Sequence, residues 1–178
     1  MKTLVFRLTL LFQLLAPFSF AQRNAGLKAL LNKNSEFIFP QTPDKVSTAL
    51  GVKTVFYEDA NDQPYAKWVT KSGMELYSPL GEDKNINEIF FVIPEDIVIE
   101  VEGLPFNLVM NRTTSKQSAL KFRREKIRRE NLGEDTMFPK GTKLSFKKGK
   151  RIITLMFDSK SLLKSLSITT DFIDASVN

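Results

Sequence analysis

The chain contains no cysteine and no histidine among its 178 residues. Without cysteine there is no disulfide framework, no thiolate metal site, no cysteine nucleophile and no lipid-anchoring N-terminal cysteine. Without histidine the chain lacks the commonest general base near neutral pH and a principal zinc ligand. The two absences together predict a protein that is not an enzyme and that carries no cofactor or metal.

Tryptophan is also scarce, occurring once at Trp68, whereas phenylalanine occurs 15 times. Phenylalanine fills a core without bringing a polar atom that needs a partner, and the hydrophobic share of 42% is enough for a packed domain. The formal net charge is +6, and removal of Lys2 and Arg7 with the leader described next (6 minus 2) leaves +4. That charge is small for a nucleic-acid-binding protein, so we expect no nucleic-acid partner.

Residues 1–21 have a short basic start, an apolar run at 8–15 and small residues near position 21, a pattern typical of a cleaved secretory signal peptide. A membrane-spanning helix needs about 20 continuous apolar residues, and Gln13 and Pro17 interrupt this run. We therefore expect a mature chain that starts at Gln22 and has no transmembrane segment. Export without cysteine indicates a bacterial periplasmic or secreted protein.

After a lead-in segment at 22–35, the pattern predicts a strand, a helix and further strands. Thr42 followed by Pro43 is a helix start, and Gly51 is suited to end that helix. The expected elements are a strand at 36–40, a helix at 42–50, and strands at 52–57, 65–70, 74–77, 87–93 and 97–101.

The second part of the chain echoes the first. Lys67–Gly73 reads KWVTKSG, and Lys143–Gly149, about 76 positions later, reads KLSFKKG. The corresponding elements are a strand at 104–110, a helix at 113–120 and strands at 143–146, 151–157 and 162–169, with an insertion at 121–140. The predicted fold class is α+β, with two tandem units at 36–102 and 103–178, each a short helix packed on an antiparallel sheet.

The run TPDKVSTALG from Thr42, a polar loop, an aromatic strand with Tyr65 and Trp68, and the sequence GMEL at 73–76 resemble the SmpA/OmlA-type small-lipoprotein domain. The same layout is similar to that of the tandem-repeat beta-lactamase inhibitory proteins, and secreted domains of uncharacterised families with this pattern look closer still. The resemblance implies a non-catalytic module that presents a sheet face and loops to another protein. The lipoproteins carry an acylated cysteine that this chain lacks, so a role in outer-membrane assembly is not implied.

The loop at 58–64 carries three carboxylates, Glu58, Asp59 and Asp62. A calcium loop would need a glycine at its sharp turn, and this loop has none. A pair of carboxylates for glycan hydrolysis can come from any part of a fold, so a hydrolase remains an alternative. A solvated turn and a partner-binding loop are the other interpretations.

Tyr65 and Trp68 are three positions apart on one expected strand, which places them on opposite faces. One of the two then belongs to the core and the other is exposed, and an exposed aromatic residue is a plausible contact residue. We include both Tyr65 and Trp68 in the predicted partner-binding set.

Residues 121–130, KFRREKIRRE, are the most highly charged stretch. One interpretation is a solvated helix or loop with internal pairing; in a helix that continues from Thr114, Glu125 can pair with Arg128 or Arg129. Alternatively, Arg123, Arg124, Arg128 and Arg129 bind a phosphate, lipopolysaccharide or acidic partner, because arginine forks suit planar anions.

The function expected from the sequence is that of an exported, non-enzymatic binding module that contacts an unknown protein or envelope component. The first alternative is an inhibitor or immunity-type protein that blocks an enzyme with its acidic loop. The second is a carboxylate-based glycan hydrolase.

Overall fold

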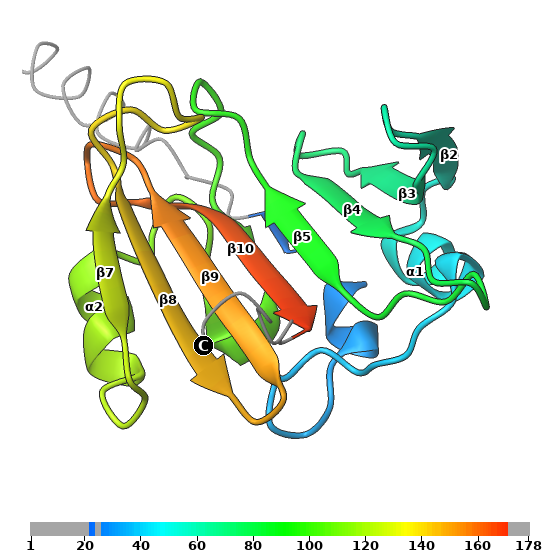
Figure 1. Cartoon of the computed structure of the whole chain (residues 1–178), viewed down its shortest axis with the longest axis horizontal. Coiled ribbons are helices and arrows are strands. Elements are labelled where there is room, and N and C mark those ends of the chain that lie inside the picture. Colours follow the sequence, from blue (N-terminus) through cyan, green and yellow to red (C-terminus); the bar gives the residue numbers. More distant parts are fainter. Residues whose placement is uncertain (1–21, 24–25, 171–178) are drawn as a thin grey trace, which may run out of the picture.

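The computed structural model describes residues 22–23 and 26–170, and it is an α+β protein in which antiparallel sheet predominates over helix (Figure 1). The expected signal peptide at 1–21 lies outside the described residues. The elements are β1 (Gln22–Arg23), η1 (Leu27–Leu30), α1 (Pro43–Leu50), β2 (Val55–Glu58), β3 (Pro64–Val69), β4 (Glu75–Pro79), β5 (Ile89–Val92), β6 (Val101–Glu102), η2 (Pro105–Asn107), α2 (Ser115–Lys121), β7 (Arg128–Asn131), β8 (Thr142–Lys148), β9 (Arg151–Phe157) and β10 (Leu163–Thr170).

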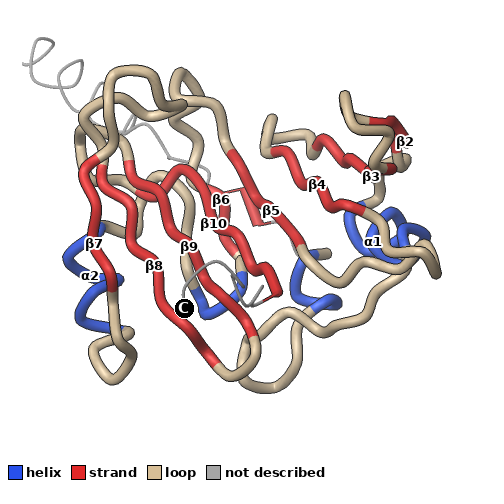
Figure 2. Tube along the Cα trace, in the orientation of Figure 1, coloured by secondary structure: helices blue, strands red, loops and turns tan. Residues whose placement is uncertain are grey.

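Eight strands form one sheet in the order β2-β3-β4-β5-β10-β9-β8-β7, and every neighbouring pair is antiparallel. Figure 2 shows the strands side by side across the molecule. The centre of the sheet is the pairing of β5 with β10, where Phe91 lies opposite Leu166. The short strands β1 and β6 form a separate parallel pair.

The two helices begin where the sequence places caps. The Thr42 side chain accepts a hydrogen bond from the Lys45 amide, and α1 ends at Gly51 with a left-handed φ of 65°. Thr114 and Gln117 form a capping box at the start of α2. The expected helix at 42–50 is therefore confirmed, and the helix expected at 113–120 is shifted by one or two residues.

Two expected strands are absent from the described structure. Residues 36–40 fold back on residues 31–35 because the Asn32 side chain accepts hydrogen bonds from the Asn34 and Glu36 amides, and only Phe37 forms an isolated bridge. At 104–110 the chain makes the turn η2, where Pro105 lacks an amide donor and Phe106 has a positive φ of 62°. Of the strand expected at 97–101, only Val101 lies in a strand, as the first residue of β6.

For residues 121–130 the sequence left a solvated helix or a loop open, and the helix does not continue: α2 ends at Lys121, turns follow, and β7 begins at Arg128. The side chain of Phe122, at the end of α2, is buried against Phe106 and Phe146, with ring centroids 5.6 and 4.4 Å away. Burying Phe122 ends the helix, and the chain then enters β7, which pairs with β8. The sequence pattern could not show that this charged stretch would form an edge strand.

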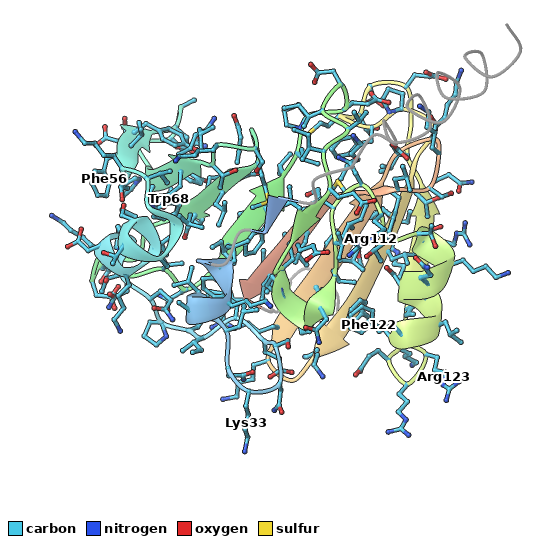
Figure 3. All side chains as sticks on the ribbon, turned by 180° about the vertical axis from the view of Figure 1, so that it is seen from behind. Lys33, Phe56, Trp68, Arg112, Phe122 and Arg123 are labelled. Carbon is cyan, nitrogen blue, oxygen red and sulfur yellow. The ribbon has the colours of Figure 1, made fainter. Side chains whose placement is uncertain are left out.

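The core lies on the face of the sheet that carries both helices. The register places Trp68, Leu76, Phe91, Leu166, Leu155 and Leu144 in one row across six strands, and all of these side chains are buried. Val46 of α1 and Phe122 at the end of α2 join this core. Figure 3, seen from behind, shows both helices in front of the sheet. No described helix covers the opposite face, which we call the open face.

Trp68 is fully buried, and its indole N–H lies 2.9 Å from Thr54 Oγ1 and 3.2 Å from Ser47 Oγ of α1. This contact links β3, the start of β2 and α1 around one side chain. We predict that Trp68→Phe lowers the free energy of unfolding by about 2 kcal/mol, because it removes the N–H donor and leaves a cavity.

The measurement is guanidinium unfolding followed by circular dichroism. Tyr65→Phe, on the same strand but the other face, is the matched control and should change the free energy by no more than about 0.5 kcal/mol. If Trp68→Phe and Tyr65→Phe changed the free energy of unfolding equally, the stabilising role assigned to the Trp68 indole would be contradicted.

Candidate functional site

The predicted site residues are divided between two opposite edges of the sheet. The acidic loop at 58–64 joins β2 to β3 at one edge, whereas the four arginines lie just before and within β7 at the other edge (Figure 1). The two groups therefore do not form one site.

The acidic loop is held by its own hydrogen bonds. Asp59 Oδ1 accepts from the Asn61 amide at 2.9 Å and from the Gln63 amide at 3.0 Å, so this carboxylate closes the turn. The side chains of Glu58 and Asp62 are exposed. Asp59 therefore holds the loop through Oδ1, and Glu58 and Asp62 are the more exposed of the three predicted carboxylates. Asp83 closes its turn similarly, and hydrogen bonds from Asn85 lower the pKa of its carboxyl group.

Trp68 cannot be a contact residue, because its side chain has no exposed surface. This corrects its place in the predicted binding set and follows from strand alternation, since Ala66 and Trp68 face the helices. Tyr65 faces the other way and is half-buried on the open face, stacked on Tyr57 with ring centroids 5.3 Å apart. The expectation that Tyr65 and Trp68 lie on opposite faces is confirmed.

The four arginines are exposed but are not gathered into a pocket. Arg123 and Arg124 lie in the turn after α2, and Figure 3 shows Arg123 pointing away from the protein. Arg128 Nε lies 2.7 Å from Glu130, which also pairs with Lys143 at 3.1 Å. The hydrogen bond from Lys143 lowers the pKa of Glu130. The arrangement is that of a solvated edge strand that carries charges of both signs.

The feature that sequence analysis missed is the open face of β2–β5. Paired residues of antiparallel strands share a face, and the registers place Val55, Lys67, Tyr77 and Phe90 in one row across four strands. The rings of Tyr77 and Phe90 are stacked, with centroids 4.8 Å apart and planes 2° apart. The alternation within each strand indicates which of its residues share a face. Which residues of different strands are neighbours on that face depends on the register, which the sequence does not show.

The complete open-face cluster contains two stacked aromatic pairs, exposed aliphatic side chains and one ion pair. The ion pair joins Lys67 to Glu75 at 2.8 Å. The members of the open-face cluster are Val55, Tyr57, Tyr65, Lys67, Val69, Glu75, Tyr77 and Phe90.

Burial raises the pKa of the Tyr77 phenol, and the neighbouring tyrosines and Glu75 add to this effect. Partial burial also raises the pKa of Tyr57, although Lys67 opposes it. Both hydroxyl groups are therefore neutral near pH 7 and can donate hydrogen bonds. The open-face cluster thus offers broad apolar ring surfaces edged by hydroxyl groups, a combination found in many protein contact surfaces.

Beside the aromatic part, the open face carries small side chains with hydroxyl groups. Across β10, β9 and β8 the row continues with Ser167, Thr154 and Ser145, and it ends at Arg128 on β7. Of these residues Ser167 is buried, and Thr154 and Ser145 are half-buried. The five pockets described for residues 22–23 and 26–170 include no member of the open-face cluster among their lining residues.

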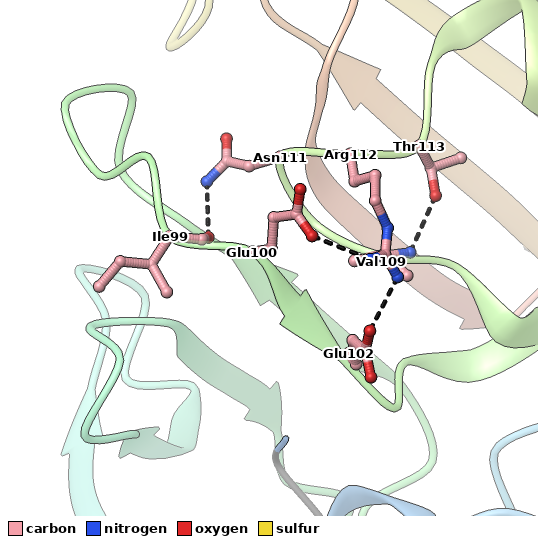
Figure 4. Close-up of polar contacts among 7 residues, drawn as sticks. All are labelled: Ile99, Glu100, Glu102, Val109, Asn111, Arg112 and Thr113. Atoms are coloured by element: carbon pink, nitrogen blue, oxygen red, sulfur yellow. Dashed lines mark hydrogen bonds and ion pairs between the residues drawn. The ribbon is translucent and has the colours of Figure 1, made fainter. Parts of the chain in front are cut away.

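A polar cluster fixes the segment that connects β5 to α2. Lys164 is buried, and its ammonium donates to the carbonyls of Glu95 and Ile97, both at 2.9 Å, while desolvation lowers its pKa. Figure 4 shows Arg112 between Glu100 and Glu102, with both distances 2.9 Å. These groups are satisfied by one another, so the cluster holds the connector in place and presents no free group to a ligand.

A cavity of about 610 Å³ lies under β9 and β10 next to residues 36–39. Its walls include Phe37, Ile153 and the Arg151 guanidinium, which lies 4.3 Å from the Phe39 ring centroid. Among its described lining residues Glu36 is the one carboxylate, and it pairs with Lys148. The cavity thus lacks the carboxylate pair of a glycosidase.

Within residues 22–23 and 26–170, no group of three or more acidic side chains is close enough to hold a metal ion. In the same part of the chain, no helix has the length and apolar character needed to cross a membrane.

Comparison with known proteins finds no matching family model and no matching curated protein. One solved structure is similar, that of a DUF4309 family protein (YjgB) from Bacillus subtilis. The identity is 11% and the TM-score 0.44, over 83% of this chain and 92% of that chain. A similarity of this degree does not assign a function, and the resemblance to small lipoproteins and inhibitory proteins stays a prediction.

Proposed function

We propose that the protein is an exported, non-enzymatic binding module that contacts a protein, or a protein component of the cell envelope, through the open-face cluster. The observation that carries the proposal is the presence of two stacked ring pairs on the open face, Tyr57 with Tyr65 and Tyr77 with Phe90. Tyr57, Tyr65, Tyr77 and Phe90 are held by the sheet backbone, so little side-chain entropy remains to be lost when a partner covers them.

The shape of the surface favours a macromolecular partner over a small molecule. Small ligands are usually bound in concave pockets that bury most of their surface. The members of the open-face cluster line none of the described pockets, and the cluster contains the ion pair between Lys67 and Glu75. Aromatic residues are enriched in protein–protein interfaces relative to the rest of the protein surface.

An inhibitor is the second candidate, and one observation favours it. The exposed carboxylates of Glu58 and Asp62 belong to the loop that follows Tyr57 and precedes Tyr65, so an acidic projection adjoins the aromatic surface. An enzyme cleft covered by this surface would receive the loop. No contact within the described residues favours the glycan hydrolase, because the loop carboxylates do not face one another across a cavity.

The contact surface can be tested by substituting two members of the cluster, the half-buried Tyr65 and the exposed Val69. We predict that Tyr65→Ser and Val69→Ser each weaken binding to a partner captured from envelope extract and then purified, by at least about tenfold in dissociation constant. The control Arg129→Ala, at the opposite edge of the sheet, should leave the constant nearly unchanged, and calorimetry with purified proteins gives all three values.

The same titration separates a general module from an inhibitor. If the protein is an inhibitor, Asp62→Ala should weaken its binding to the partner strongly. If it is a module that contacts the partner only through the rings, Asp62→Ala should change the affinity very little. Loss of binding in Arg129→Ala with unchanged affinity in Tyr65→Ser would reject the open face as the contact surface.

We further infer that the sheet consists of two related units, 36–102 and 103–178. The inference is supported by the element order, because α1 precedes β2–β5 and α2 precedes β7–β10. It is also supported by the sheet order, which runs β2-β3-β4-β5 and then reverses as β10-β9-β8-β7. The echoed sequences at 67–73 and 143–149 lie in the corresponding hairpins.

If the units are separate in folding, the two fragments 22–102 and 103–178 should associate when co-expressed and recover the circular dichroism spectrum of the intact chain. The β5–β10 pairing supplies the contact between them. Fragments that remain unstructured together, while a cut elsewhere in a loop is tolerated, would count against two units.

A further inference from the structure

The two edges of the sheet differ in character. The outer edge strand β7 carries Arg128, Arg129 and Glu130, and charged residues of this kind protect an edge from pairing with another strand. The opposite edge strand β2 reads Val-Phe-Tyr-Glu, and Val55, Phe56 and Tyr57 are 57%, 63% and 41% exposed. Figure 3 places Phe56 at the outer limit of the molecule. The β2 edge is thus apolar and has no neighbouring strand in the described chain.

The hydrogen-bond phase of β2 shows which backbone groups are free to pair. The Asp59 amide donates to the Gln63 carbonyl, and the Pro64 carbonyl accepts from Leu80 on the other side of β3. Backbone groups alternate in direction along a strand. The amides and carbonyls of Val55 and Tyr57 therefore point toward β3. The amide and carbonyl of Phe56 therefore point outward, as do those of Glu58.

We propose that the β2 edge pairs with the β2 edge of a second copy of this chain, antiparallel, with Phe56 opposite Phe56 on a two-fold axis. This register satisfies the backbone, because Phe56 exchanges both of its outward hydrogen bonds with its counterpart. Phe56 lies opposite Ala66, so its side chain is on the helix-bearing face. With Phe56 opposite Phe56, the two copies have their helix-bearing faces on the same side of the combined sheet.

The side chains fit the same register. Each pair joins groups that are compatible in size or opposite in charge, and each occurs twice by symmetry. The pairs flanking Phe56 are Val55 with Tyr57, Thr54 with Glu58, and Lys53 with Asp59. The last pair places an ammonium group beside a carboxylate at each end of the interface, which is the charge complementarity expected of a cross-strand contact.

The neighbouring registers do not fit. Centring the pairing on Tyr57 places Glu58 against Phe56 and Asp59 against Val55, so carboxylates meet apolar side chains. Centring it on Val55 places Phe56 against Thr54 and leaves Lys53 against Tyr57, without the charge pair. The register centred on Phe56 is therefore selected by the side chains of this short strand.

A groove beside β2 adds a place for the second copy's ring. Phe56 lines this groove together with Thr54 and with Ser47 and Thr48 of α1. In the proposed dimer the second copy's Phe56 lies next to the first at this groove, and the two open faces become parts of one sheet. The inference goes beyond the proposed function and does not depend on it.

The interface is small because four-residue strands bury little surface, so the dimer is expected to be weak and concentration-dependent. We predict that sedimentation equilibrium of the exported, processed protein shows a reversible monomer–dimer equilibrium. Phe56→Glu should raise the dimer dissociation constant by at least about tenfold, because it places two carboxylates opposite each other on the axis.

Leu120→Glu is the matched control, because Leu120 is 64% exposed on α2 at the other end of the molecule. It should leave the dimer dissociation constant unchanged. Circular dichroism melting of both variants shows whether the fold is kept, and both sites are exposed enough to tolerate the change.

A second pair of variants tests the register itself. Lys53→Glu should weaken the dimer because it faces Asp59, and adding Asp59→Asn should restore part of the loss while retaining the acceptor that closes the loop. A monomer at all concentrations, a dimer unaffected by Phe56→Glu, or a Lys53→Glu defect that Asp59→Asn does not relieve would each overturn the proposal.

Discussion

The pairing of β5 with β10 is the contact on which the rest of the structure depends. It joins two groups of strands that lie far apart in the sequence, with Leu166 opposite Phe91 at the centre of the core. The connector between these groups is fixed beside the same strands, because Lys164 of β10 holds the carbonyls of Glu95 and Ile97. Without this pairing, each four-stranded group would have an additional uncovered edge and an incomplete core.

The antiparallel sheet separates the core from the proposed contact surface, because its side chains alternate between the two faces. Trp68 and Leu76 stabilise the helix-bearing face, while Tyr65, Lys67 and Tyr77 on the same two strands build the open face. A substitution on the open face can therefore change binding without opening a cavity in the core. The edges differ in a similar way, since charges protect β7 and apolar residues are exposed on β2.

Local signals in the sequence predicted the local structure well. Thr42, Pro43 and Gly51 defined α1 almost to the residue, and the alternation around Trp68 correctly separated two faces. The missed features depend on contacts that are distant in sequence. Phe122 leaves its helix to meet Phe106 and Phe146, and the stacked pair Tyr77–Phe90 exists only through a register that no single strand encodes. The predicted binding set was therefore wrong about Trp68 and did not include Tyr77 or Phe90.

Native-state hydrogen exchange tests the central claim, that β5 and β10 join the two groups into one sheet, most directly. The account predicts that the amides of β5 and β10 exchange only through global unfolding, with the same free energy of opening and more slowly than those of the edge strands β2 and β7. Opening free energies for β5 and β10 that differ by more than about 2 kcal/mol, or protection no greater than at the edges, would contradict it.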